Sequence, residues 1–282
     1  MAYDSARGRV LLFGGEGTSG AFFNDTWEWD GESWTQVADI GPTPRTMATM
    51  ACDESRGRVA LFGGYGAGRP RPRDTWEWDG EAWTQMADTG PSSRTGHAMA
   101  GDKKRQHIVL FGGSAFLDPG QDPGPQGDTW VWTGDVWTKV EDTGPSARAS
   151  LAMAYDPTRE RTVLLGGVDS STGNILGDTW EWDGNLWTHR TDIGPGGMVG
   201  HAMVFNGRFV ETFGGRGVTG ELLGNTWEWD GKHWTARQDM GPSPRTAFSL
   251  AYDSKRDRVV LFGGSAADGS HNDLWEQFQY TV

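Results

Sequence analysis

Four arginines at matching places in the chain are the residues best suited to bind a ligand. Five Asp-x-Gly-Pro segments recur about 50 residues apart, and the third residue after the proline is arginine in four of them and Met198 in the other. A guanidinium group binds a carboxylate in a bidentate manner, so four of them together would bind an acidic ligand. Alternatively, each arginine caps a nearby carbonyl group or the aspartate of its own loop. The arginines are Arg45, Arg94, Arg148 and Arg245.

Two histidines and one glutamate are the candidates for moving a proton. His97 and His201 each follow a glycine at matching places, and imidazole titrates near neutral pH. Glu211 stands in an apolar segment where the other repeats carry Leu, Ala or Val, and a carboxylate in such a place acquires a shifted pKa suited to acid or base chemistry. Glu211 and His201 are therefore candidate catalytic residues, and His97 is a candidate ligand-binding residue. The alternatives are a structural hydrogen bond for each histidine and a solvent-facing sheet edge for Glu211.

The usual motifs of catalysis and metal binding do not occur in the sequence. There is no glycine-rich phosphate loop that opens a helix and no Gly-x-Ser-x-Gly nucleophile motif. Cys52 is the only cysteine, which excludes a disulfide within the chain and a zinc site of several cysteines. We interpret Cys52 as a small buried hydrophobic residue. The histidines are scattered one at a time, and we expect no metal ion and no cofactor.

Charge and hydropathy exclude whole classes of function. The chain has 282 residues, with 25 Lys and Arg against 38 Asp and Glu, and its formal net charge is −13. Proteins that bind phosphate backbones need clustered cations, so we expect no nucleic-acid partner. The mean hydropathy is −0.58, and no apolar run approaches the roughly 18 residues of a membrane span. We expect a soluble monomer without a signal peptide in this chain, either cytoplasmic or trimmed from a secreted protein.

Six glycine doublets divide the chain into repeats. Each doublet follows a short apolar run, and successive doublets are 48 to 54 residues apart. The segments between them are short, rich in β-branched and aromatic residues and separated by Gly, Asp and Asn, which predicts four antiparallel strands per repeat. No segment has a sustained helical periodicity. The doublets are Gly14-Gly15, Gly63-Gly64, Gly112-Gly113, Gly166-Gly167, Gly214-Gly215 and Gly263-Gly264.

From end to end, these repeats resemble the kelch-repeat β-propeller family. A repeat near 50 residues with a glycine doublet after the second strand and paired aromatic residues downstream carries the resemblance. It implies an all-β fold, a six-bladed β-propeller of four-stranded antiparallel blades around a central channel, as one domain of residues 1–282. Members of the family include sugar-acid epimerases, a copper oxidase, iron-dependent specifier proteins and many protein-binding domains. The fold therefore leaves the function open.

Two sets of repeated side chains are predicted to be structural. All 16 tryptophans lie at repeated places in the third and fourth strands, and residues two apart share a strand face, so their rings should pack between blades. Third-strand glutamates should pair with second-strand arginines, because both are replaced in the third repeat, by Val131 and His107. The glutamates are Glu28, Glu77, Glu181, Glu228 and Glu276, and the arginines are Arg9, Arg58, Arg161 and Arg258.

The loops and the last repeat supply two further expectations. Phe22 and Phe23, the arginines at 69, 71 and 73, and the Pro- and Gly-rich loop 114–127 are predicted to form one side of a recognition surface. The sixth repeat ends without the Trp-Asp-Gly turn that precedes a fourth strand, so its blade should lack a full outer strand.

These observations favour a binding module that recognises a protein segment or a small acidic ligand at the channel mouth bearing the four arginines. One alternative is an enzyme similar to the sugar-acid epimerases, in which the arginines hold a carboxylate and Glu211 or His201 moves protons. Another is an engineered or ligand-free scaffold, which the regularity of the repeats also fits.

Overall fold

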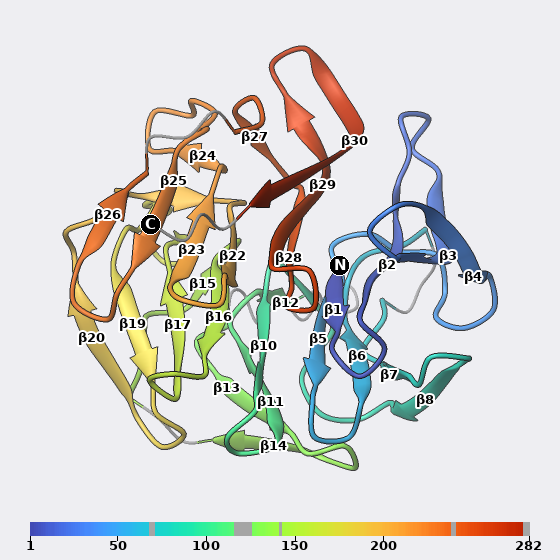
Figure 1. Cartoon of the computed structure of the whole chain (residues 1–282). Helices are drawn as coiled ribbons and strands as arrows, with labels where there is room; N and C mark the ends of the chain where they lie inside the picture. The colour runs from blue at the N-terminus through green and yellow to red at the C-terminus, as the bar shows by residue number, and fades with distance from the viewer. Residues whose placement is uncertain (68–70, 116–125, 141–142, 238–240, 279–282) are drawn as a thin grey trace. The chain divides into compact units, whose positions relative to one another are not determined.

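β-Strands account for all the regular structure in the part of the chain that the computed structural model describes, namely residues 1–67, 71–115, 126–140, 143–237 and 241–278. The chain divides into two compact units, residues 1–141 and 142–282, and each contains three four-stranded antiparallel sheets, the blades (Figure 1). The prediction of an all-β, six-bladed β-propeller is confirmed. The central channel and the single domain stay predictions. In the described ranges there is no helix long and apolar enough to cross a membrane.

The first unit contains blades one to three. Blade one consists of β1 (Ala2–Asp4), β2 (Arg9–Glu16), β3 (Phe22–Trp29) and β4 (Trp34–Ala38), in that order across the sheet. Blade two consists of β5 (Thr49–Asp53), β6 (Arg58–Phe62), β7 (Thr75–Trp78) and β8 (Trp83–Ala87). Blade three consists of β10 (Ala98–Asp102), β11 (His107–Phe111), β13 (Thr129–Trp132) and β14 (Trp137–Val140), with a short pair, β9 (Arg94–Thr95) and β12 (Ser114–Ala115).

The second unit contains blades four to six. Blade four consists of β16 (Ala152–Asp156), β17 (Arg161–Leu165), β19 (Thr179–Trp182) and β20 (Trp187–Thr191), beside the pair β15 (Arg148–Ala149) and β18 (Val168–Asp169). Blade five consists of β22 (Ala202–Phe205), β23 (Val210–Phe213), β25 (Thr226–Trp229) and β26 (Trp234–Ala236), beside β21 (Met198–Val199) and β24 (Arg216–Gly217). Blade six consists of β27 (Arg245–Thr246), β28 (Ser249–Asp253), β29 (Arg258–Ala266) and β30 (Gly269–Phe278).

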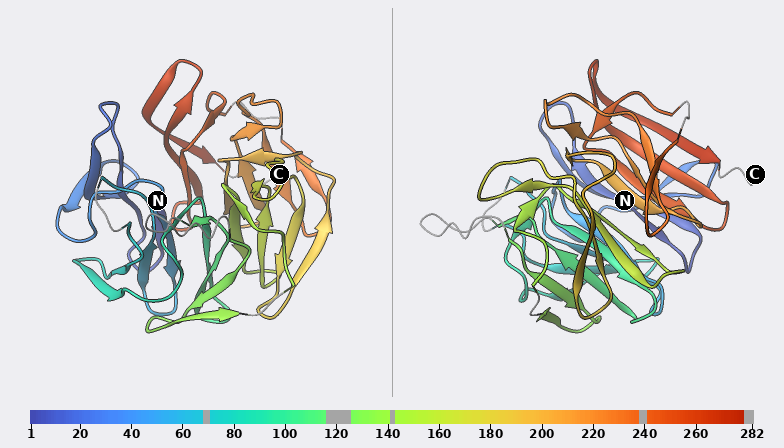
Figure 2. Two further views of the ribbon diagram at one scale, coloured as in Figure 1. Left: turned by 180° about the vertical axis from the view of Figure 1, so that it is seen from behind. Right: turned by 90° about the vertical axis from the view of Figure 1, so that its left-hand side faces the viewer.

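Blade six departs from the other five. Its four strands are not equivalent to theirs, because β27 is a two-residue strand that pairs with the far end of β29. The long hairpin of β29 and β30, drawn in red, supplies the second and third strands (Figure 2). In the described residues no strand pairs with the outer edge of β30, as the sequence predicted.

The glycine doublets are required where two loops, one before the same blade and one before the next blade, approach the end of the second strand. Gly63 and Gly64 both have positive φ angles, 69° and 97°, which L-residues with a side chain rarely adopt. A Cβ atom on Gly63 would lie 2.7 Å from the carbonyl oxygen of Arg94, and one on Gly64 would lie 2.8 Å from that of Thr46. A side chain at either position would push these loops apart.

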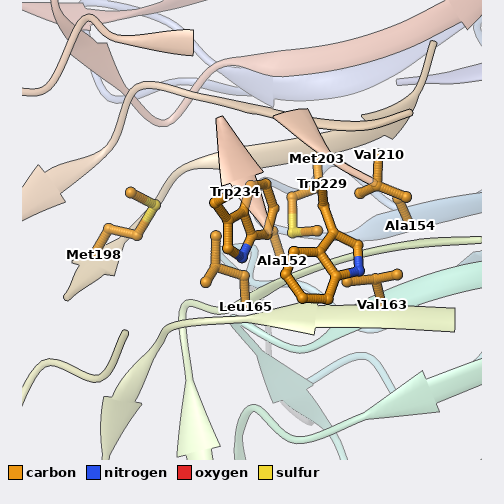
Figure 3. Close-up of a cluster of buried hydrophobic side chains, with 9 residues drawn as sticks. All are labelled: Ala152, Ala154, Val163, Leu165, Met198, Met203, Val210, Trp229 and Trp234. Atoms are coloured by element: carbon orange, nitrogen blue, oxygen red, sulfur yellow. The ribbon is translucent and has the colours of Figure 1, made fainter. Parts of the chain in front are cut away.

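Most of the tryptophans lie in the cores that join neighbouring blades, as predicted. In blades two to five the second tryptophan of the third strand packs against the tryptophan of the fourth strand, with ring centroids 5.4 to 5.6 Å apart. Figure 3 shows Trp229 and Trp234 of blade five beside Val163 and Leu165 of blade four. The core assignment was wrong for Trp275, which is 41% exposed because no fourth strand covers it among the described residues.

In blades two and four the third-strand glutamate pairs with a different arginine from the predicted one. Arg56, in the turn between β5 and β6, donates to both carboxylate oxygens of Glu77, at 3.0 Å to Oε2. Asp53 orients Arg56 by accepting from its Nε at 2.8 Å. Arg58, the predicted partner, donates to a backbone carbonyl instead. The corresponding pair in blade four is Arg159 with Glu181.

Candidate functional site

The four candidate arginines are buried, each only 1% exposed. Arg94 shows their common geometry: Nη1 and Nη2 donate to the two carboxylate oxygens of Asp128 at 2.8 and 3.2 Å. The carbonyl oxygen of Gly112, in the glycine doublet, accepts from Nη1 at 2.9 Å. Ser92 accepts from Nε and Nη2. All five N–H groups of Arg94 are therefore engaged, and the equivalent aspartates for Arg45, Arg148 and Arg245 are Asp74, Asp178 and Asp273.

The ion pairs keep these aspartates charged. Burial alone would raise the pKa of the Asp128 carboxyl, but the hydrogen bonds and positive charge of Arg94 outweigh burial and hold that pKa below its ordinary value. The hydrogen bond from Arg245 is the main cause that lowers the pKa of the more exposed Asp273 to about 2. Each pair is thus ionic at neutral pH.

This geometry gives the arginines a structural role inside their own blades. Each one caps a carbonyl group, as the structural interpretation predicted, and this carbonyl belongs to the glycine doublet. The aspartate precedes the third strand in blades two to four and lies within β30 in blade six, whereas the same interpretation named the aspartate of the arginine's own loop. A ligand-binding role for Arg45, Arg94, Arg148 and Arg245 stays a prediction.

Blade five lacks both partners of this ion pair. Met198 stands at the arginine position and Asn225 at the aspartate position. Met198 is buried in the apolar cluster that joins blades four and five (Figure 3). The sequence shows both replacements. That the two positions form an ion pair becomes evident only from the contacts in the other blades.

The two candidate histidines are buried and neutral. His97 is 3% exposed, and its Nε2 shares a hydrogen bond with the hydroxyl of Thr49 in blade two. Burial, with a smaller contribution from the charge of Arg94, lowers the pKa of His97 to about 3. His201 is also buried, and burial lowers its pKa to about 4. In blade four the counterpart of Thr49 is Ala152, which has no hydroxyl to offer His201.

Glu211 is held inside blade five. It is 1% exposed, which contradicts the alternative of a solvent-facing edge. Asn206 donates to its Oε2 at 3.0 Å, and Arg237 Nη1 lies 3.5 Å from the same oxygen. Glu228 stands directly across the strand pair and binds the same two groups, Asn206 at 3.2 Å and Arg237 at 3.1 Å.

The turn before β23 accounts for a carboxyl group at position 211. The other blades carry an aspartate at the place of Asn206 and an arginine three residues later in the turn, but the shorter turn of blade five lacks both. Glu211 on β23 and Arg237, the residue after β26, restore a carboxylate and a guanidinium there. A catalytic role for Glu211 or His201 stays a prediction.

In the first unit a group of side chains gathers at the same end of the strands as the arginines, at the start of β3 and on the loops that follow β4 and β6. Phe22 contacts the ring of Tyr65 edge to face, with centroids 5.4 Å apart, and the Arg71 guanidinium lies 4.7 Å from the centre of the Tyr65 ring. Phe23 is 45%, Met47 60% and Tyr65 37% exposed. We call these five residues the aromatic loop cluster.

Backbone hydrogen bonds hold the segments of this cluster together. The Arg45 N–H donates to the carbonyl of Phe23 at 3.0 Å, and Thr46 and Tyr65 exchange two bonds of 2.8 Å. The sequence predicted Phe22, Phe23 and Arg71 for a recognition surface but missed Met47 and Tyr65, which a comparison of exposed loop positions would have found. Arg69 and residues 116–125 of the predicted surface lie outside the described residues.

The second unit has an open cleft of about 710 Å³ between loops of blades four and five. Its walls include four glycines, Val218 and two acidic residues, Asp178 and Asp192. Among the described residues that line it there is no lysine or arginine, so its charge does not favour an acidic ligand. In the ranges that the structure describes, no group of three or more His, Cys, Asp and Glu side chains is placed to hold a metal ion.

Comparison with known proteins agrees with the arrangement of the blades. Residues 1–191 match the family model described as the KLHDC2/KLHL20/DRC7 Kelch-repeats domain, which covers about two thirds of the chain. No curated protein matches the sequence. The glycine doublets, the four-stranded blades and this match together show that the chain belongs to the family of kelch-repeat domains.

Proposed function

We propose that this chain is a protein-binding module that recognises a segment of a partner protein through the aromatic loop cluster. Its kelch propeller fold supports a protein-interaction module in general. The observation that carries the proposal is the exposure of Phe23, Met47 and Tyr65, which lie at the start of β3 and on two loops that backbone hydrogen bonds hold to it.

The chemistry of the cluster is that of a protein interface. Aromatic residues, methionine and arginine are enriched at the centres of interfaces, where their large side chains bury much area. Arg71 lies over Tyr65, and Arg73, at the exposed end of the same loop, donates to the carbonyl of Asp88. These two cations favour a partner segment with an apolar anchor and acidic neighbours, although the net charge of the whole protein is −13.

A library of displayed peptides selected against the protein tests the proposal. We expect the enriched peptides to bind the double variant Phe23→Ser and Tyr65→Ser at least tenfold more weakly, with little change in melting temperature. The matched control is Val136→Ser with Leu186→Ser, since these residues are 56% and 58% exposed in third-to-fourth-strand turns. If the control weakens binding as much as the cluster variant, or if neither does, the proposal is wrong.

In the structure, the epimerase-like alternative gains no support from the four arginines. Their N–H groups are engaged by aspartates, carbonyls and hydroxyls of their own blades. We therefore propose no second function.

A further inference from the structure

Met47 is the most exposed methionine among the described residues. Its side chain is 60% and that of Met86 37% exposed, whereas the other described methionines are buried or half-buried. An oxidant dissolved in water reaches a thioether sulfur where the side chain meets solvent. Met47 is therefore the methionine that such an oxidant meets most easily. The buried methionines are Met99, Met153, Met198 and Met203.

The backbone of Met47 lies in the left-handed region, with a φ angle of 56°. Glycine takes this conformation without strain, but a residue with a side chain pays free energy for it. A long apolar side chain in solvent adds little packing in return, so the fold alone gives no reason for a methionine here. Strain at an exposed residue points to a role outside the fold. The equivalent residues of the later repeats are all small and also have positive φ: Gly96, Ser150, Gly200 and Ala247.

The chain neighbours of Met47 hold it in the aromatic loop cluster. Thr46, on one side, exchanges two backbone hydrogen bonds of 2.8 Å with Tyr65. Ala48, on the other side, lies so close to Gly64 that a Cβ atom on this glycine would be 3.0 Å from the Ala48 methyl carbon. The turn that carries Met47 is thus anchored at both ends to the segment of Tyr65, while its side chain stays in solvent.

The thiol of the chain does not compete with Met47 for an oxidant. Cys52 is the only cysteine, and burial raises the pKa of its thiol to about 11. The thiolate is the form of cysteine that peroxides oxidise. Because so little thiolate is present at neutral pH, a peroxide acts on an exposed methionine instead.

We propose that Met47 is a modification site at which oxidation to the sulfoxide weakens the binding of a partner segment to the aromatic loop cluster. The inference rests on the proposed function, because it concerns regulation of the same surface. The oxidant is hydrogen peroxide. A lone pair on Sδ attacks one peroxide oxygen, the O–O bond breaks and an S–O bond forms. The sulfur loses two electrons, and the second oxygen leaves as water with both hydrogens.

The sulfoxide changes what the cluster offers to a partner. A flexible apolar thioether becomes a polar group whose oxygen accepts hydrogen bonds. An apolar anchor of the partner that packs on Met47, Phe23 and Tyr65 must then remove water from this oxygen, which costs binding free energy. Methionine sulfoxide reductases return the sulfoxide to the thioether, so the change is reversible.

Peptide mapping by mass spectrometry tests the first step on the whole protein and needs no partner. The protein is treated with dilute hydrogen peroxide, and the sulfoxide at each methionine is followed over time. We expect Met47 to be oxidised faster than Met86 of β8, the next most exposed methionine among the described residues, and the buried methionines to be slowest. Oxidation of Met86 or of a buried methionine as fast as that of Met47 overturns the proposal.

The peptides enriched against the protein test the second step. We expect peroxide treatment to weaken their binding to the parent protein about tenfold, and we expect treatment with methionine sulfoxide reductases to restore it. Met86→Leu should respond to peroxide as the parent does. Met47→Leu, whatever its own affinity, should bind equally before and after treatment.

The outcomes separate this inference from the proposed function. If the parent with oxidised Met47 keeps its affinity, or if Met47→Leu loses as much affinity in peroxide as the parent, the modification site is wrong. The proposed function then still stands, provided that Phe23→Ser with Tyr65→Ser weakens peptide binding. If no enriched peptide depends on Phe23 and Tyr65, both are wrong.

Discussion

At the scale of single residues, the buried arginines are the sharpest case of a side chain with two competing roles. Arg94 and Asp128 form a pair in which the arginine is 1% and the aspartate 11% exposed at their side chains. Removing one partner of such a pair leaves a charge without compensation in a place of low dielectric constant. Blade five shows what replaces both partners, since Met198 and Asn225 stand in their positions.

We predict that Arg94→Met lowers the free energy of unfolding by about 3 kcal/mol. The double variant Arg94→Met with Asp128→Asn should recover most of that loss, because it copies blade five. Urea unfolding of the two variants and the parent measures both values. An unchanged unfolding free energy in Arg94→Met, together with weaker binding of carboxylated ligands, would instead support the ligand-binding role.

Cys52 is a second residue whose surroundings decide its chemistry. Burial, which outweighs the hydrogen bonds from Ser5, raises the pKa of the thiol to about 11. The thiolate is the reactive form of cysteine. We therefore predict that iodoacetamide modifies Cys52 in the folded protein roughly a hundredfold more slowly than an exposed cysteine at pH 8. A rate equal to that in the urea-unfolded chain would show that the thiol is accessible and ionised.

At the scale of elements, the turn between the first and second strands needs a left-handed residue. Gly8 and Gly57 occupy this place in blades one and two, with φ angles of 64° and 61°. Gln106, Glu160 and Asp257 occupy it in blades three, four and six, with φ between 55° and 59°. A residue with a side chain is strained in this conformation.

We predict that Gln106→Gly raises the free energy of unfolding by about 0.5 to 1 kcal/mol. Glycine relieves backbone strain in the folded protein, and this gain exceeds the stabilisation of the unfolded chain by its added conformational freedom. Gln106 is exposed, so little packing is lost. The reverse change, Gly57→Ala, should lower it. Thermal melts of both variants give the sign, and a loss of stability in Gln106→Gly would contradict the strain argument.

At the scale of the whole molecule, the buried ionisable groups act together in acid. The pKa values of His97 and His201 lie at about 3 and 4, below the ordinary 6.5. A lowered histidine pKa means that the unfolded chain takes up a proton before the folded protein does, so stability is present above pH 6.5 and is lost as the pH falls toward 4. The lowered pKa values of Asp74, Asp128 and Asp178 act in the same direction at still lower pH.

We predict that the protein is markedly less stable at pH 5.0 than at pH 7.5. His201→Leu, which copies the leucine at the equivalent position 151, should reduce that difference by about 2 kcal/mol. Urea unfolding at the two pH values measures it. If the variant keeps the full pH dependence of the parent, His201 is not neutral in the folded protein.

The sequence by itself determined the blades. Glycine doublets and strand-length apolar runs recur at a nearly constant spacing. Each of them specifies the conformation of only a few residues, so the local pattern is enough to predict six four-stranded antiparallel blades. The same comparison among repeats predicted the core place of most tryptophans.

Only the tertiary structure decided which groups each polar side chain meets. Arg94 is separated from Asp128 by 34 residues along the chain, and no local pattern distinguishes an arginine with all its N–H groups engaged from one that faces a ligand. The turn arginine Arg56 took the place predicted for Arg58 beside Glu77, because an aspartate in the turn aims it there. The contact between Tyr65 and Phe22 was also outside the reach of the sequence. Contacts between blades depend on how loops of variable length fold over one another.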